Sequence, residues 1–123
     1  MYKKNFTSQF KPLIINQYLF VITNNDFLIS MDIKTGEIIY SYDLNQNIAD
    51  FLKTKKKQAK FKNFMMLNNK IYIFLDNSFY IVLKVNGQVE SIRKLPSKIS
   101  SNISIVKKSL LYLDRKNRVS IVD

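Results

Sequence analysis

The sequence contains no cysteine, no histidine and no tryptophan. The lack of cysteine excludes a disulfide framework and a thiolate metal site within this chain. The lack of histidine removes the commonest general base and metal ligand, and with it Ser-His, Cys-His and His-metal chemistry. Asp and Glu residues form no paired or clustered set that could replace these groups, and we predict that the chain is not an enzyme and that it holds no catalytic residue, cofactor or metal.

Glycine and proline are also scarce, with two of each among 123 residues. This is low for a β protein with many turns, and asparagine takes turn positions in their place. The longest apolar run near the start, residues 13–22, is interrupted by Asn16 and Gln17, so no transmembrane segment is predicted. Lys3 and Lys4 are followed by neither a long apolar region nor a small-residue cleavage site. We therefore expect no signal peptide in this chain.

The residues that are present indicate one globular domain with a strong positive charge. Hydrophobic residues make up 46% of the chain, and nine Phe and seven Tyr can fill a core. Twenty Lys and Arg residues against nine Asp and Glu residues give a net charge of +11. This charge favours nucleic acid, an anionic membrane or an acidic protein as partner. The codon usage of an AT-rich genome is an equally good explanation.

One hairpin pattern occurs three times, at residues 19–32, 71–84 and 110–123, and the three copies align without a gap. Each copy has an apolar strand, a polar turn and a second strand. The copies start 52 and 39 residues apart, whereas a four-stranded propeller blade takes about 40–45 residues. The surplus of the first interval lies at residues 45–60.

Residues 45–60 carry a helical pattern, because Ile48, Phe51 and Leu52 are spaced as on one helix face. Asn45 or Asn47 is a candidate N-cap, and Lys55, Lys56 and Lys57 suit the C-terminal end of a helix. The sequence therefore predicts a short, inserted and largely exposed helix near residues 46–57.

The remaining strand patterns complete a meander around each hairpin. Together they predict an all-β fold, a partial β-propeller of about 2.75 four-stranded antiparallel blades. The expected strands are residues 10–15, 18–23, 27–32 and 37–42, then 61–66, 70–75, 79–85 and 88–94, with 102–106 as the outer strand of the third copy. The expected organisation is an N-terminal tail or end of an upstream blade (1–9), a blade (10–44), an inserted basic helix or linker (45–60), a second blade (61–95) and an incomplete last blade (96–123).

The turn after the strand at residues 27–32 carries a recognisable motif. Asp32, Thr35, Gly36 and Tyr40 follow the form D-x-x-T-G-x-x-x-aromatic, which resembles the repeat signature of the PQQ-like β-propeller superfamily, with Tyr40 where Trp is usual. Gly87 is the counterpart of Gly36 in the second repeat. There the shorter Asn86-Gly87 sequence is typical of a two-residue hairpin turn, and Lys84 and Ser91 stand where Asp and the aromatic are expected.

Within this superfamily the chain most resembles the C-terminal part of BamB-type propeller lipoproteins of the outer-membrane β-barrel assembly machinery, which end on a strand similar to residues 117–123. The resemblance implies a non-catalytic scaffold for protein–protein interaction in the periplasm or cell envelope. It gives the motif residues structural roles: Asp32 and Thr35 bond nearby backbone, and Tyr40 docks against the next blade. It also implies further blades, from a longer chain or from other copies of this one. A fragment of a PQQ-dependent quinoprotein dehydrogenase is the alternative, although no ligand set for its calcium and quinone is assignable here.

A run of lysines is the strongest surface feature of the sequence. It comprises Lys53, Lys55, Lys56, Lys57, Lys60 and Lys62. The run is either a solvated face or a contact for anionic lipid headgroups or an acidic protein, and near a membrane each lysine contributes about 1 kcal/mol. A small basic nucleic-acid-binding β protein is a third interpretation. Phe61 and Phe64 are the aromatic residues nearby, which is little for stacking on bases.

Overall fold

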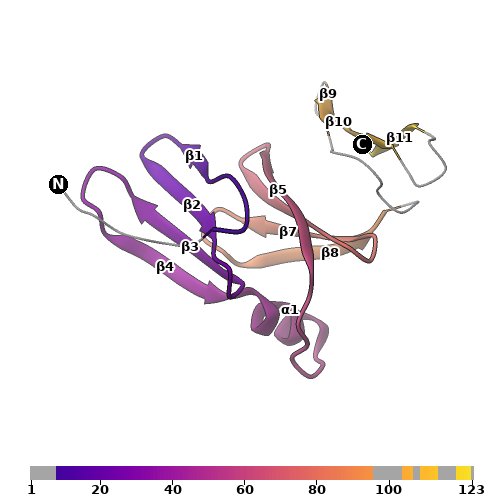
Figure 1. Ribbon diagram of the computed structural model, residues 1–123, viewed down its shortest axis with the longest axis horizontal. Coiled ribbons are helices and arrows are strands. Elements are labelled where there is room, and N and C mark those ends of the chain that lie inside the picture. Colours follow the sequence, from indigo (N-terminus) through magenta and orange to yellow (C-terminus); the bar gives the residue numbers. More distant parts are fainter. Residues whose placement is uncertain (1–7, 96–103, 107–108, 114–118, 123) are drawn as a thin grey trace. The chain divides into compact units, whose positions relative to one another are not determined.

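The computed structural model describes residues 8–95 and the backbone of residues 104–106, 109–113 and 119–122 (Figure 1). It divides into two compact units. The first comprises Met1–Gln58 with Asn86–Gln88, and the second comprises Ala59–Val85 with Val89–Asp123. In the described part the single helix, α1, lies in the first unit, and every other regular element is a strand.

The first unit contains a four-stranded antiparallel meander. Its strands follow chain order, β1 (Leu13–Ile15), β2 (Tyr18–Ile22), β3 (Phe27–Asp32) and β4 (Ile38–Asp43). Strand β1 begins at Leu13 and not at the expected residue 10, because Pro12 has no N–H to donate to a ladder. Asn16 and Asp26 make the turns with positive φ angles of 55° and 68°, a conformation that Asn and Asp tolerate better than most residues.

A second meander of the same form follows in the second unit. It consists of β5 (Phe61–Leu67), β6 (Lys70–Leu75), β7 (Phe79–Lys84) and β8 (Val89–Lys94), again in chain order. Near the end of the chain, β9 (Ser104–Val106), β10 (Ser109–Leu113) and β11 (Val119–Val122) form a three-stranded sheet in the order β11-β10-β9. The expected strand residues 102 and 103 lie outside the described residues.

The three hairpins have the same register, as their gapless alignment predicts. Aligned residues pair with aligned residues in every copy: Leu19 with Met31, Ile71 with Leu83, and Leu110 with Val122. The first two meanders also share a register shift, between Ser30 and Met31 in one and between Val82 and Leu83 in the other. The predicted all-β fold, a partial β-propeller built from repeated antiparallel meanders, is confirmed.

The inner strands of each meander are covered on both faces, since consecutive residues, which point to opposite faces, are buried together. In the first unit Phe20, Val21 and Ile22 are at most 3% exposed. In the second unit the rings of Tyr72, Phe74 and Tyr80 stack with centroids 5.3–6.4 Å apart. Burial of such side chains stabilises by about 1.5–3 kcal/mol each, so these strands hold the fold together.

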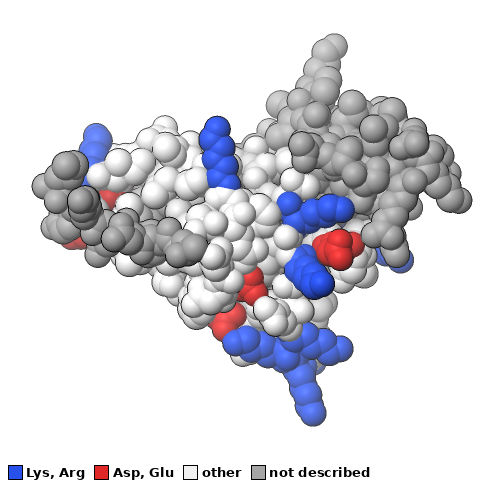
Figure 2. Space-filling view, in the orientation of Figure 1, with Lys and Arg blue, Asp and Glu red and all other residues white. Residues whose placement is uncertain are grey.

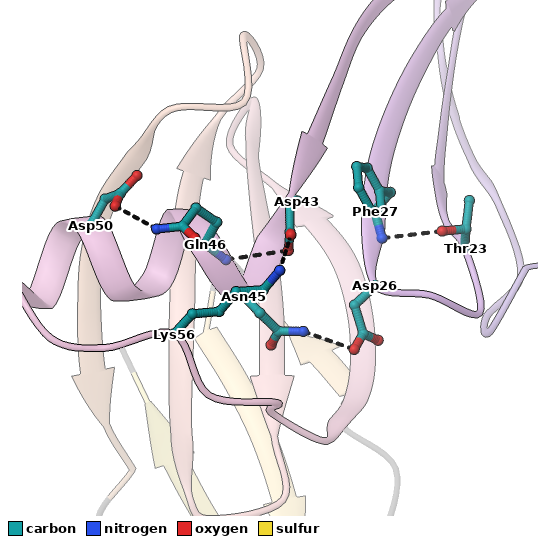
Figure 3. Close-up of polar contacts among 8 residues, drawn as sticks. All are labelled: Thr23, Asp26, Phe27, Asp43, Asn45, Gln46, Asp50 and Lys56. Carbon is teal, nitrogen blue, oxygen red and sulfur yellow. Dashed lines mark hydrogen bonds and ion pairs between the residues drawn. The ribbon is translucent and has the colours of Figure 1, made fainter.

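Helix α1 (Leu44–Leu52) is placed differently from the prediction of residues 46–57. Asp43, and not Asn45 or Asn47, is the N-cap: its carboxylate accepts a hydrogen bond from the backbone N–H of Gln46 at 3.3 Å (Figure 3). Lys53 adopts the left-handed conformation with φ 56° and ends the helix. The last turn therefore carries no basic residue, and the expected support of a helix end by Lys55, Lys56 and Lys57 is wrong.

The predicted apolar face of the helix is also wrong. Leu44 and Ala49 are buried, while Phe51 and Leu52 are 44% and 50% exposed. The start of the helix is fixed by Asp26, a buried residue of the β2–β3 turn, whose carboxylate accepts a hydrogen bond from Asn45 Nδ2 at 2.9 Å (Figure 3). This polar anchor holds the helix with Leu44, Asn45 and Ala49 buried, and Phe51 and Leu52 lie outside the buried face.

Candidate functional site

The motif turn between β3 and β4 is organised by the Asp32 carboxylate. Its Oδ1 accepts hydrogen bonds from the backbone N–H groups of Lys34 and Thr35 at 2.9 and 3.3 Å. Its Oδ2 accepts one from Gln17 Nε2 at 2.8 Å, from the neighbouring β1–β2 turn. Gly36 has a positive φ of 74°, and its N–H donates a hydrogen bond to the Asp32 carbonyl at 2.7 Å. Asp32 thus ties two adjacent turns together.

Opposing effects act on the pKa of Asp32. Desolvation raises it, but the hydrogen bonds from Gln17, Lys34 and Thr35, with the charge of Lys34, outweigh desolvation and hold the pKa below its ordinary value of 3.8. The carboxylate therefore stays ionised in neutral solution and acts as a hydrogen-bond acceptor. This environment is unsuited to general-acid chemistry, which needs a raised carboxyl pKa.

Tyr40 forms a stacked pair with Tyr42 on β4, with ring centroids 4.9 Å apart. Burial is the largest effect that raises the pKa of the Tyr40 phenol, and the neighbouring Tyr42 raises it further. A hydrogen bond with the Ser30 side chain lowers this pKa, but by less than the other two effects raise it. Both rings lie against Gly87, which belongs to the same compact unit. A Cβ at Gly87 would lie 2.4 Å from Cε2 of Tyr42 and 3.0 Å from Cε1 of Tyr40. The aromatic pair therefore packs on bare backbone.

The second repeat keeps the turn chemistry with a different residue. In the first repeat Thr35 Oγ1 accepts a hydrogen bond from the N–H of Glu37 at 3.2 Å. In the second, Asn86 Oδ1 accepts one from the N–H of Gln88 at 3.0 Å. Each acceptor precedes a glycine of positive φ. The turn is not a two-residue hairpin, however, because the shift after Val82 pairs Leu83 with Val89 and leaves residues 84–88 between them.

A row of apolar side chains crosses the first sheet next to the motif turn. Ladder partners share a sheet face, and the register places four residues in one such line: Ile14 opposite Leu19, Leu19 opposite Met31, and Met31 opposite Ile38. We call Ile14, Leu19, Met31 and Ile38 the apolar row. Its two ends are 65% and 44% exposed at Ile14 and Ile38, and Leu19 and Met31 are half-buried. Sequence periodicity could not find it, because periodicity marks apolar residues without showing which ones remain uncovered.

An open pocket of about 440 Å³ lies at the same end of the sheet. It is lined by Asn16 and Gln17 from the β1–β2 turn and by Ile33 and Lys34 from the β3–β4 turn. Ile33 is itself 47% exposed. The hydrogen bond between Gln17 and Asp32 fixes the two turns that form the walls. The pocket and the apolar row together form the candidate site, which offers apolar contacts beside amide groups and one ammonium group.

The lysine run is divided between the two units and lies outside the helix. Lys53, Lys55, Lys56 and Lys57 occupy the turn and loop after α1 in the first unit, whereas Lys60 precedes β5 and Lys62 lies in β5 in the second. Lys56 forms an ion pair with Asp43, and the hydrogen bond from its ammonium group is the largest effect that lowers the pKa of Asp43. Figure 2 shows basic side chains gathered at the lower edge of the view, over the loop that follows α1.

The described residues contain no group of three or more His, Cys, Asp or Glu residues placed to hold a metal ion. Among the same residues, no helix is long and apolar enough to cross a membrane.

Repeated four-stranded antiparallel meanders with a common register define the chain as part of a β-propeller. Comparison with solved structures agrees. The chain is similar to BamB from Moraxella catarrhalis, with a TM-score of 0.69 and 14% identity over 94% of this chain and 32% of that one. It is also similar to the quinohemoprotein alcohol dehydrogenase from Comamonas testosteroni, with a TM-score of 0.56 and 14% identity over 89% of this chain and 17% of that one.

Both of these proteins are PQQ-like β-propellers, so the resemblance predicted from the sequence is confirmed at the level of the fold. The chain spans about a third of the BamB chain and about a sixth of the dehydrogenase chain. No family model and no curated protein matches the sequence. One of the two similar structures is an enzyme, which shows that this fold serves more than one kind of function.

Proposed function

We propose that the chain is a non-catalytic propeller scaffold that binds a partner protein through the apolar row and the adjoining pocket. The observation that carries this proposal is the exposure of the row: Ile14 and Ile38 are 65% and 44% exposed at its two ends. Contiguous exposed apolar groups rimmed by polar ones are typical of protein-binding surfaces. The likeness to BamB in fold supports the choice of a scaffold.

The side chains of this surface indicate what kind of partner surface would bind to it. Ile14, Ile33 and Ile38 offer an apolar centre of the kind that forms the desolvated core of an interface. Lys34 and Gln17 at the pocket add a positive charge and an amide at its edge. With the net charge of +11 on the whole chain, this favours a partner that presents an apolar anchor within an acidic surface.

Site-specific photo-crosslinking tests the proposal. A benzophenone amino acid is placed at Ile14 or Ile38 and, as a control, at the exposed Lys84 of β7. We expect one protein to crosslink from the two row positions and not from the control. With that protein purified, Ile14→Asp combined with Ile38→Asp should weaken binding at least about tenfold, since buried interface anchors contribute 1–2 kcal/mol or more each. Unchanged affinity of this variant would contradict the proposed site.

The absence of catalysis is tested separately. The purified chain is incubated with pyrroloquinoline quinone, Ca²⁺, a primary alcohol and a redox dye. We expect no alcohol-dependent reduction of the dye beyond a protein-free control. Turnover that survives purification would contradict a non-catalytic scaffold and favour the dehydrogenase alternative.

A further inference from the structure

We propose that the end of α1 and the turn after it form a site that binds an anionic lipid surface, with Phe51 and Leu52 inserted between the headgroups and Lys53, Lys55 and Lys57 on their phosphates. This goes beyond the scaffold function and uses a different surface. Strand β4 runs from Ile38 at the apolar row to Asp43, and α1 begins directly after it. The lipid site therefore lies at the other end of the first sheet (Figure 1).

The apolar part of this site is created by the way the helix is held. Leu44, Asn45 and Ala49 are the buried side chains of α1, and the hydrogen bond from Asn45 to Asp26 fixes that orientation. Phe51 and Leu52 in the last turn are consequently 44% and 50% exposed. Two adjacent large apolar side chains at the exposed end of a short helix are unfavourable in water and favourable at a membrane interface.

The basic part follows without a break in the chain. Lys53, Lys55, Lys56 and Lys57 are all exposed. Asp50 is the exposed acid closest in sequence, and Gln46 Nε2 donates a hydrogen bond to it at 2.8 Å. Within the segment 53–57, as the structure describes it, Lys56 forms an ion pair with Asp43. The other three ammonium groups are placed on flexible stems that can reach phosphate oxygens on either side of an inserted Phe51.

The composition favours a lipid over an acidic protein. The desolvated core of a protein interface is depleted in lysine and uses arginine where it needs a cation. This segment has four lysines and no arginine. Lysine is a compact, strongly hydrated charge that suits a fluid layer of headgroups, where no fixed bidentate geometry is required. The combination of aromatic and aliphatic anchors with lysines is typical of elements that lie in the interfacial region.

Vesicle co-sedimentation of the full chain tests the site. Vesicles of phosphatidylcholine are compared with vesicles in which phosphatidylglycerol replaces about a third of the lipid, at about 0.01 M and about 1 M salt, where the Debye length is about 30 and 3 Å. We expect binding to the anionic vesicles at low salt and little binding in the other conditions. Each lysine strengthens binding about fivefold, so Lys53→Gln, Lys55→Gln and Lys57→Gln together should weaken it about 100-fold.

Matched variants separate this site from the general charge of the chain. Lys11→Gln, Lys34→Gln and Lys84→Gln remove the same charge from dispersed positions and should weaken binding far less. Phe51→Ser with Leu52→Ser should weaken binding about tenfold. The same change at Ile14 and Ile39, which are 65% and 52% exposed, should leave binding unchanged. Equal losses from the clustered and dispersed lysine variants would overturn the proposal.

Insertion itself has a spectroscopic signature, because the chain contains no tryptophan. Phe51→Trp introduces a single reporter, and Ile39→Trp is its control. We expect the emission of the first variant to shift to shorter wavelength on anionic vesicles and to be quenched by brominated acyl chains, with neither change in the second. Binding without these changes, or binding of polyglutamate in place of vesicles, overturns the lipid site. Neither result affects the apolar row, so the two proposals fail independently.

Discussion

The contact between Gly87 and the aromatic pair of β4 predicts a large effect for a single methyl group. In the Gly87→Ala variant the new Cβ would meet Tyr42 Cε2 at 2.4 Å and Cδ2 at 2.6 Å. Both distances are far below van der Waals contact, so the ring or the turn must move. The φ of 89° at this position adds strain for any residue with a Cβ.

Two contributions set the magnitude. Holding an L-residue at positive φ costs about 1 kcal/mol, and overpacking a fitted contact costs about 1–3 kcal/mol. We therefore expect Gly87→Ala to lower the free energy of unfolding by about 2–4 kcal/mol. Urea titration followed by circular dichroism measures it, with the slope against denaturant as a check that the unfolded surface area is unchanged.

A double-mutant cycle with Tyr42→Ala separates the two contributions. When Tyr42 is absent, Gly87→Ala should cost mainly the backbone part, about 1 kcal/mol, because the remaining contact, with Tyr40 at 3.0 Å, is the least close of the three. The coupling free energy is then about 1–3 kcal/mol. Gly36→Ala, at the glycine of the corresponding turn with φ 74°, gives an independent value for the backbone part. A coupling below about 0.5 kcal/mol, the usual limit of additivity for distant sites, would refute the packing of Tyr42 on Gly87.

Three further changes have expected outcomes. Ser78 has a φ of 74° and a buried hydroxyl with no hydrogen-bond partner within the described residues. Ser78→Gly should raise the free energy of unfolding by about 1 kcal/mol, because relief of backbone strain and removal of the buried hydroxyl outweigh the larger conformational entropy of the unfolded chain. A lower thermal midpoint would contradict this. Asp43→Ala should cost about 1 kcal/mol through the lost N-cap, whereas Asn47→Ala should stay within about 0.5 kcal/mol, both measured by urea titration. Asp32 has a lowered folded pKa, so its contribution to stability is present above the ordinary pKa of 3.8 and is lost as the pH falls through the folded pKa. As the pH is lowered below 3.8, Asp32→Asn should lose less stability than the parent chain, and parallel pH profiles would speak against it.

The repeated hairpins could be predicted from the sequence because they rest on local patterns. Strand alternation, polar turns and an ungapped alignment fix which residues pair, and the register of Leu19 with Met31 recurs in each copy. The helix was predicted less well, since its orientation depends on one distant contact. Asp26 lies in a turn well before the helix, and nothing in the pattern around Asn45 indicates that the two meet in a buried hydrogen bond.

The candidate site could be predicted only in part. The motif residues Asp32, Thr35 and Gly36 lie together because they are close in sequence. The contact of Tyr42 with Gly87 joins residues far apart in the chain, and the motif drew attention to Tyr40 alone. The apolar row was missed because burial depends on which neighbours cover a strand. Ile14 and Val21 are both apolar strand residues, yet one is 65% and the other 3% exposed.

The shared hydrogen bond of Thr35 and Asn86 has a consequence for how such repeats can change during evolution. What the turn requires is an oxygen that accepts from the N–H two residues ahead, followed by a glycine, and either a hydroxyl or a carboxamide meets that requirement. The hydrogen-bond geometry of this position is therefore more strictly constrained than the residue type that occupies it. Substitutions can accumulate at the Thr, Asp and Trp positions of the signature while every blade keeps its strand register. Such a chain can still be recognised from its fold after its sequence has diverged.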